Sequence, residues 1–262
     1  MAGASTGIGA ALVAALTEDG HDARGFGRIV CDVRREDDVQ FLCARLRDES
    51  PGLDALIVTA GTFGAIGRLP FTDSAAWEDA ILTNVLGLYY LAKHGLPLLE
   101  QGTRPRLITF AGGGAFGAFP RYSAYATSKA AVVRLTECLA AECRPKGIAV
   151  NAIAPGMVDT PIHQQTMAAG AWRAGTLQFQ KTLECQDGAG VPMAVPVDCV
   201  RWLLSPEADG ITGRTIAAAF DPWRDPEFAK QLIADPALCT LRRHQLPDRP
   251  LDMRPGDEGA YA

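Results

Sequence analysis

Short apolar runs alternate with helical patterns along most of the chain. Apolar residues at helical spacing predict helices over residues 11–20, 38–50, 84–99, 123–143 and 197–205, and the first of these ends at Gly20. Continuous apolar stretches at 53–61, 106–112, 148–156 and 210–220 predict buried strands. Strands that alternate with helices in this way are typical of α/β folds. The pattern therefore predicts a doubly wound parallel sheet with helices on both faces.

The strand pattern is incomplete near the start of the chain. A doubly wound sheet has a central strand before its glycine-rich loop, but only Met1 and Ala2 precede Gly3. We expect this first strand to be missing and the native protein to begin upstream of Met1. In addition, only Arg28 separates the strand-like runs 22–27 and 29–33, whereas a parallel crossover needs about a dozen residues. We expect the intervening helix to be absent and the third strand to be vestigial or lost.

The 262 residues, of which 48% are hydrophobic, are consistent with a single large domain. Residues 157–195 lack a strand pattern and are expected to form a helical lid near a ligand. Residues 221–262 are rich in Pro, Asp and Arg and are expected to form a C-terminal tail on the surface.

Composition and charge narrow the class of partner. The net charge is −5, and no run of Lys or Arg favours nucleic acid or an anionic membrane, so we expect a small-molecule substrate. The seven cysteines form no C-x-x-C pair, and the four histidines lack metal-ligand spacing. We therefore expect free thiols, no metal site and a cytoplasmic location. No stretch is apolar enough to span a membrane.

Two stretches carry candidate chemistry. Gly3, Gly7 and Gly9 precede a predicted helix, where glycines let backbone N–H groups approach a pyrophosphate. The alternative is a helix N-cap with a glycine-rich turn that occurs by chance. Tyr125 and Lys129 lie four residues apart and project from one helical face. A nearby ammonium would lower the phenol pKa from about 10 and create a general acid/base. The alternative is a packed tyrosine beside a solvated lysine.

Six motifs occur in order: G-x-x-x-G-I-G at 3–9, Asp32-Val33, Ala60-Gly61, Asn84, Tyr125-x-x-x-Lys129 and Asn151-x-x-x-Pro155-Gly156. Together they resemble a short-chain dehydrogenase/reductase over about residues 2–220. The resemblance implies a Rossmann-type fold, a nicotinamide cofactor and hydride exchange between a carbonyl and a hydroxyl group on a small metabolite. It also implies a homodimer or homotetramer. The alternative is a degenerate member that binds a nucleotide or a protein partner without turnover.

The resemblance also implies a set of site residues. Tyr125 is the acid/base, Lys129 lowers its pKa and holds the nicotinamide ribose, and Asn84 orders a relay water. The implied cofactor contacts are Gly3, Ser5, Thr6, Gly7, Ile8, Gly9, Arg28, Asp32, Val33, Ala60, Gly61, Tyr125, Lys129, Pro155, Gly156, Val158 and Thr160. Three alternatives stay open: Asn84 could bond a backbone group, Asp32 could cap the next helix, and Thr160 could begin a turn.

The residue at the end of the second strand-like run, 22–27, indicates which cofactor is preferred. An acid at this place usually receives the ribose of NAD, but Gly27 stands there and Arg28 follows. A guanidinium can pair with a 2′-phosphate, so we expect NADP to be preferred and NAD to be possible. The alternative is a solvated arginine.

The family places a serine at the end of the strand before the tyrosine, to hydrogen-bond the substrate oxygen. That place falls at Ala111 or Gly112, neither of which has a hydroxyl. Loss of one such donor typically slows a reaction by about 10²–10³. Gly112–Gly114 could form a nest of backbone N–H groups that holds the oxygen instead, or they could form a flexible loop.

Overall fold

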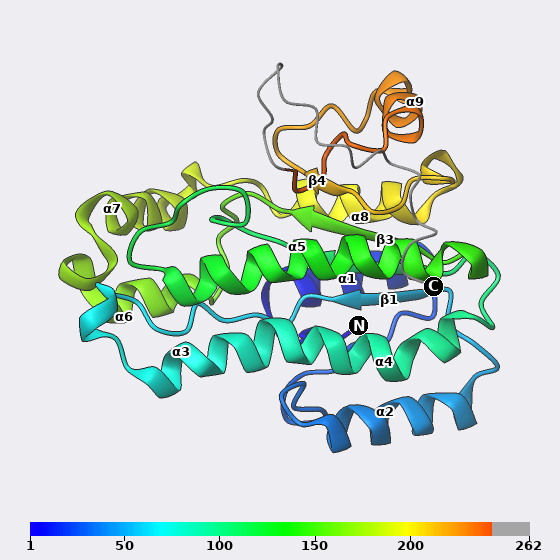
Figure 1. Ribbon diagram of the computed structural model, residues 1–262, viewed down its shortest axis with the longest axis horizontal. Coiled ribbons are helices and arrows are strands. Elements are labelled where there is room, and N and C mark those ends of the chain that lie inside the picture. The colour runs from blue at the N-terminus through cyan, green and yellow to red at the C-terminus, as the bar shows by residue number, and fades with distance from the viewer. Residues whose placement is uncertain (243–262) are drawn as a thin grey trace, which may run out of the picture.

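Four parallel strands form the centre of the computed structural model, which describes residues 1–242 (Figure 1). The strands are β1 (Ala55–Val58), β2 (Arg106–Phe110), β3 (Ala149–Ala154) and β4 (Thr215–Ala217), and they lie side by side in this order. Ala55 lies opposite Arg106, which lies opposite Ala149. Each strand falls within a stretch predicted from the apolar pattern. The predicted parallel sheet is confirmed.

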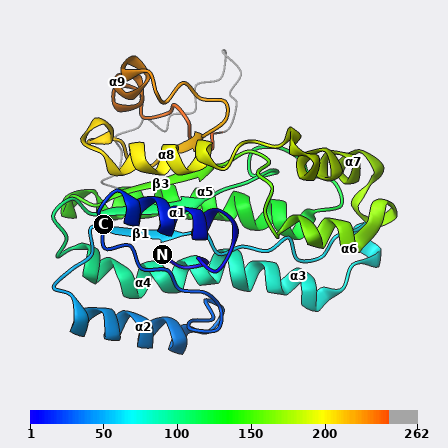
Figure 2. The same cartoon turned by 180° about the vertical axis from the view of Figure 1, so that it is seen from behind.

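Helices cover both faces of this sheet. α4 (Gly87–Leu99) and α5 (Ser123–Cys143) cover one face, and α2 (Glu36–Glu49) packs outside α4 (Figure 1). α1 (Gly7–Glu18) and α8 (Ala194–Leu204) cover the other face, which is turned to the viewer in Figure 2. The doubly wound arrangement expected from the sequence is therefore present.

Alternate side chains of β2 enter different layers. Leu107 packs in the apolar cluster of α2, α4 and α5, whereas Ile108 and Phe110 pack in the cluster of α1 and α8. The Thr109 hydroxyl is hydrogen-bonded to the Thr136 hydroxyl of α5 at 2.8 Å. All five residues of the strand are buried. This explains the continuous apolar run, because both faces of a parallel sheet are covered.

The sheet is reduced beside β1. Residues 1–6 form no strand, but Ala2 makes single parallel bridges to Phe26 and Val58. The Ala2 N–H donates to Ile57 O at 3.0 Å, and the Thr59 N–H donates to Ala2 O at 2.9 Å. Residues 28–30 form a turn, and residues 28–33 contain neither helix nor strand. The expected losses of the first strand, the intervening helix and the third strand are thus seen among residues 1–33.

The other helical segments lie around this framework. The helix predicted at 84–99 is part of a longer one, in which α3 (Ser74–Ile81), the π-helical turn η2 (Leu82–Leu86) and α4 follow without a break. The expected lid segment holds α6 (His163–Ala174), α7 (Thr176–Glu184) and the π-helical turn η4 (Cys185–Ala189). Short 3₁₀ helices are η1 (Leu69–Phe71), η3 (Arg144–Lys146) and η5 (Pro206–Ala208).

The described part of the predicted tail contains α9 (Pro226–Ala234), which buries Phe228 and Leu232 against the α8 side of the core. Residues 243–262 of that predicted tail lie outside the described residues. Among residues 1–242, none of the helices combines the length and apolar character needed to cross a membrane.

Candidate active site

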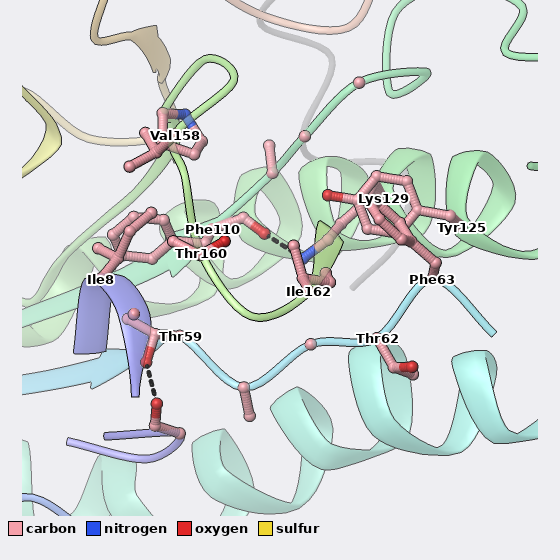
Figure 3. Close-up of a pocket in the computed structure, with 18 of the residues that line it drawn as sticks. Ile8, Thr59, Thr62, Phe63, Phe110, Tyr125, Lys129, Val158, Thr160 and Ile162 are labelled. Carbon is pink, nitrogen blue, oxygen red and sulfur yellow. Dashed lines mark hydrogen bonds between the residues drawn. The ribbon is translucent and has the colours of Figure 1, made fainter. Parts of the chain in front are cut away.

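A cavity of about 850 Å³ lies where the four strands end (Figure 3). Its walls come from the loops after β1, β2 and β3, from the N-terminus of α1, and from the predicted lid. Every residue expected to contact the cofactor lines this one cavity: Gly3, Ser5, Thr6, Gly7, Ile8, Gly9, Arg28, Asp32, Val33, Ala60, Gly61, Tyr125, Lys129, Pro155, Gly156, Val158 and Thr160. The fold therefore brings together residues that are up to 157 positions apart in the sequence.

The glycine-rich loop has no room for side chains. A Cβ atom added to Gly3 would lie 2.3 Å from the backbone nitrogen of Ala60, and one added to Gly9 would lie 2.4 Å from the Gly3 carbonyl oxygen. Gly3 and Gly7 also have φ values of +84° and +57°, a region that favours glycine. The close approach of the loop to the end of β1 therefore requires glycine at these positions.

The N-terminus of α1 faces this cavity without a side-chain cap. Its N-cap residue, Thr6, makes no capping hydrogen bond, and the first turn contains no acidic residue. The first N–H groups of a helix lack intrahelical partners and attract anions. Thr59 fixes the loop, because its hydroxyl lies 3.0 Å from both Ala2 O and Gly3 O; Figure 3 shows one of these bonds. The contacts of Thr59 are therefore structural.

At the far side of the glycine loop, ion pairs control the electrostatics. Arg34 donates to both carboxylate oxygens of Asp32 and, from its other terminal nitrogen, to Asp79 at 2.6 Å. These contacts lower the pKa of Asp32 to about 2. Asp32 does not cap α2, whose N-cap is Arg35, so the capping alternative is wrong. Sequence reasoning did not identify Arg34, because its partner Asp79 lies 45 residues away.

The Gly27 position is crowded by the Ser5 side chain. A Cβ atom added there would lie 2.8 Å from the Ser5 hydroxyl oxygen, so a larger residue at this place would require Ser5 to move. Arg28 lines the cavity with its side chain 70% exposed, and its Nε lies 3.4 Å from Asp32 Oδ2. An exposed pair of this length is weak. The guanidinium therefore remains accessible to an anion in the cavity.

Tyr125 and Lys129 lie at the opposite end, both from α5 and both buried (Figure 3). The Lys129 ammonium donates to the Phe110 carbonyl oxygen at 2.7 Å and lies 5.6 Å from the centre of the Tyr125 ring. Burial lowers the Lys129 pKa to about 8 and raises the Tyr125 pKa above its usual value. The tyrosine shift is opposite to the one expected from the sequence, because loss of water outweighs attraction to an ammonium that bonds elsewhere.

Gly112 lies directly against the tyrosine hydroxyl. A Cβ atom added to Gly112 would lie 2.2 Å from the Tyr125 hydroxyl oxygen. Ala111, by contrast, is buried against Ala115 and Val133. The Ala115 N–H donates to Gly112 O at 3.2 Å, and Gly114 has φ +84°, so these glycines form a turn. The tyrosine hydroxyl thus fills the space that a side chain at Gly112 would need.

Asn84 lies behind the wall of the cavity, in the π-helical turn η2. Its amide nitrogen donates to Thr62 O at 2.9 Å and to the Ser128 hydroxyl at 2.8 Å, and its Oδ1 accepts from the Thr62 N–H. The side chain therefore bonds a backbone group, as in the structural alternative. Asn84 fixes the loop that carries Gly61, where an added Cβ would lie 3.6 Å from Lys129 Nζ.

The segment predicted to be a lid also lines this cavity. Gln165 of α6 accepts hydrogen bonds from the Thr62 hydroxyl and the Phe63 N–H, both at 3.0 Å, and so joins α6 to the loop after β1. Gln178 and Lys181 of α7 also line the cavity. Neither side chain belongs to a motif, and no sequence signal identified them. Thr160 lines the cavity, and its carbonyl oxygen accepts from the His163 N–H in a turn. The turn expected as the structural alternative is therefore present, and the residue also borders the cavity.

Among residues 1–242, no three His, Cys, Asp or Glu side chains gather in an arrangement that could hold a metal ion.

The similarity of this chain to known proteins extends over most of the described residues. The model of the family described as "Enoyl-(Acyl carrier protein) reductase" matches residues 3–219. The "Short-chain dehydrogenase/reductase eriH" of Hericium erinaceus is 34% identical over 214 residues, which cover 79% of this chain and 81% of that protein.

Solved structures show the same fold. The ligand-free aldohexose dehydrogenase of Thermoplasma acidophilum has a TM-score of 0.71 at 24% identity, covering 82% of this chain and 89% of that one. A variant of the actinorhodin polyketide ketoreductase with NADPH has a TM-score of 0.68 at 25% identity, covering 82% and 93%.

Proposed function

The chain belongs to the short-chain dehydrogenase/reductase family, and from this premise we propose that it interconverts a carbonyl and a hydroxyl group on a small metabolite, with NADPH as the preferred cofactor. Family membership supports an NAD(P)-dependent oxidoreductase activity. The substrate group and the preference for NADPH are the parts that we propose beyond it. One observation carries the carbonyl–hydroxyl assignment: Tyr125 and Lys129 stand at one end of a cavity whose other end is an anion-attracting glycine loop.

The residues fit a dinucleotide. The crowded glycines form a cradle that side chains would fill, and the uncapped start of α1 would receive the pyrophosphate. Asp32 and Val33 would border the adenine, Lys129 would hold the nicotinamide ribose, and Val158 and Thr160 would meet the carboxamide. When bound, the cofactor supplies the hydride that is exchanged with the substrate carbon.

The preference for NADPH rests on the Gly27 region. Position 27 carries no acid, the Asp32 carboxylate is already paired with Arg34, and Arg28 presents an accessible guanidinium. A ribose hydroxyl therefore lacks a free carboxylate partner there, while a 2′-phosphate has a cation. The polyketide ketoreductase of similar fold is described with NADPH, which supports the same assignment.

We assign proton donation to Tyr125. Burial raises the pKa of its phenol, which keeps the group protonated at neutral pH but makes it a weaker acid, so efficient transfer requires that pKa to fall when cofactor and substrate are bound. We assign the return of the proton to the Lys129 ammonium, whose pKa is lowered by burial and whose Nζ lies 5.6 Å from the centre of the Tyr125 ring, through a water near Asn84.

The substrate oxygen needs a donor besides Tyr125. Ala111 and Gly112 provide no hydroxyl, but Gly113 and Gly114 line the cavity, and within residues 1–242 their N–H groups have no hydrogen-bond partner. Backbone donors fixed in a turn can stabilise a developing oxyanion. We assign this role to the 112–115 turn.

The test is a Tyr125→Phe variant, assayed by NADPH oxidation against ketones, aldohexoses and keto thioesters. Loss of the proton donor is expected to lower kcat/KM by about 10³ or more while NADPH binding stays unchanged. Tyr122→Phe is the matched control, because Tyr122 is the N-cap residue of α5, three residues before Tyr125, and bonds Thr166 outside the cavity.

Tight NADPH binding with no turnover by the native chain across the whole panel would instead identify a binding protein that lacks catalysis. The cytoplasmic location and the homodimer or homotetramer stay predictions, to be checked by fractionation and by light scattering.

A further inference from the structure

A second, smaller cleft lies on the outer side of the lid. Its volume is about 150 Å³, and it is lined by Arg68, Phe71, Arg121, Trp172 and Arg173. Three of these five residues carry a guanidinium, and no acidic residue lines the cleft. None of its residues lines the large cavity, so the cleft is separate from the proposed active site.

These arginines differ from most others in the chain. Arginines such as Arg34, Arg104 and Arg201 have a carboxylate within 4.0 Å. Within residues 1–242, no carboxylate lies within that distance of Arg68, Arg121 or Arg173. A chain of net charge −5 thus concentrates unpaired positive charge at one place. Such a concentration attracts anions.

Hydrogen bonds fix the three segments that form the cleft. The Gly67 N–H donates to the Arg121 carbonyl oxygen at 2.8 Å, which holds the segment of Arg68 against Arg121. Arg121 Nη1 donates to Trp172 O at 2.5 Å and to Arg173 O at 3.3 Å, near the end of α6. Arg121 therefore joins both sides of the cleft.

The Arg121 backbone is unusual as well. Its φ is +71°, a conformation that non-glycine residues adopt rarely. Strained residues of this kind persist where the surrounding structure holds them, often at binding sites. The Arg121 guanidinium lies at the end of α6, where it donates to Trp172 O, and Arg121 lines the cleft together with Arg68 and Arg173.

The rim of the cleft is apolar and exposed. Phe71 and Trp172 are 67% and 74% exposed, respectively, although both are large hydrophobic residues. Exposed aromatic side chains beside guanidinium groups can stack on a flat apolar group while the arginines bind its charge. The volume suits a phosphate-sized head group rather than a whole nucleotide, since sites for larger ligands are typically about 300–1,000 Å³.

From these observations we propose that the cleft is a second binding site, which takes a phosphate monoester joined to a flat apolar group. Arg68 and Arg173 bind the phosphate, Arg121 fixes the geometry, and Trp172 and Phe71 contact the apolar part. The site is independent of the cofactor and of the reaction proposed for the large cavity.

The experiment follows the ¹⁹F NMR signal of Trp172 in the full chain labelled with 5-fluorotryptophan, with Trp172→Phe used to assign the signal. Phenyl phosphate is the probe, titrated to millimolar concentration. We expect a saturable shift of the Trp172 signal, a weaker response to inorganic phosphate, and none to phenol with sodium chloride at equal ionic strength. Trp202 and Trp223 are buried in the core and serve as internal references.

The variant Arg68→Gln/Arg173→Gln is expected to raise the Kd for phenyl phosphate by about tenfold or more, because charge-assisted hydrogen bonds are lost. Arg121 stays unchanged, since it supports the end of α6. Arg144→Gln is the matched control: Arg144 is exposed, without a carboxylate partner within residues 1–242, and located in η3 away from the cleft.

Three results would overturn the proposal. The first is no shift of the Trp172 signal with phenyl phosphate. The second is an equal Kd for the native chain and the Arg68→Gln/Arg173→Gln variant. The third is loss of the shift when NADPH is present, which would place the probe at the start of α1 instead.

Discussion

The two ends of the large cavity are both crowded around glycines, but different groups create the crowding. At the glycine loop, added Cβ atoms on Gly3 and Gly9 would collide with backbone atoms of Ala60 and Gly3. At the tyrosine end, an added Cβ on Gly112 would collide with the Tyr125 hydroxyl, which is the far end of a side chain. Backbone cannot move without disturbing the sheet, whereas a phenol can rotate. The first end is therefore rigid by construction, and the second is adjustable.

The two ends also differ in what shifts the pKa values of their ionisable groups. Near the glycine loop, a part-buried network of ion pairs lowers the pKa of Asp32 to about 2. At the tyrosine end, burial alone shifts the pKa values of Tyr125 and Lys129. The comparison shows that one cavity combines a solvated, charged end suited to phosphate with a dry end suited to proton transfer.

The largest effect is expected from Gly9→Ala. The new Cβ would meet Gly3 O and the Thr59 hydroxyl, so we expect the free energy of unfolding to fall by about 3 kcal/mol and NADPH binding to be lost. Thermal unfolding and NADPH titration measure both. Gly117→Ala is the control, because Gly117 lines the same cavity but an added Cβ has no atom within 4 Å. Normal stability and binding in Gly9→Ala would show that the loop is not rigid.

Burial of Lys129 predicts a pH-dependent stability. Between its folded pKa of about 8 and its unfolded value of about 10.4, the unfolded state binds more protons, so stability rises with pH in this window. The free energy of unfolding of the native chain, relative to Lys129→Met, is expected to increase by about 3 kcal/mol from pH 7 to above pH 10. Urea unfolding across this range measures the difference. A constant difference would mean that the ammonium is solvated.

Gly112→Ser tests the adjustable end. The serine would displace the Tyr125 hydroxyl rather than restore a missing donor, and a displacement of about 1 Å can lower kcat by about 10². Ala111→Ser is the companion variant: Ala111 lines the cavity but packs in a buried cluster with Ala115 and Val133, so we expect little gain from a hydroxyl there. Steady-state kinetics separate the outcomes. Faster turnover in either serine variant would indicate that the native site lacks a donor it needs.

The smallest effect is expected at the solvated end. Arg28→Gln should weaken NADPH binding by about tenfold and leave NADH binding unchanged, because only the 2′-phosphate contact is lost. Fluorescence titration with both cofactors gives the ratio. An equal loss for NADPH and NADH would assign Arg28 to a part of the dinucleotide that both cofactors share.

Much of the fold could be read from the sequence, because each strand and helix carries its own apolar period. The β2 run is buried on both sides, and α5 was predicted with the bounds that it has. The helix from Ser74 to Leu99 was predicted only in part, since a π-helical turn at Asn84 shifts the pattern between its halves. Short loops such as 28–33 were predictable from length alone.

Of the residues that line the cavity, the sequence indicated only those that belong to motifs. Gln165, Gln178 and Lys181 enter it from the lid without any motif, and Arg34 depends on a partner 45 residues away. The arginines of the small cleft lie in three separate segments, and only hydrogen bonds through Arg121 bring them together.

By itself, the sequence determined the order of elements, the glycine loop, the Tyr125–Lys129 pair and the family, because each is encoded in local spacing. The tertiary structure alone decided how these parts meet. Gly112 could be recognised as the contact for the Tyr125 hydroxyl only after α5 had packed against β2. The direction of the Tyr125 pKa shift likewise depends on burial, which arises from contacts among distant segments and leaves no local pattern in the chain.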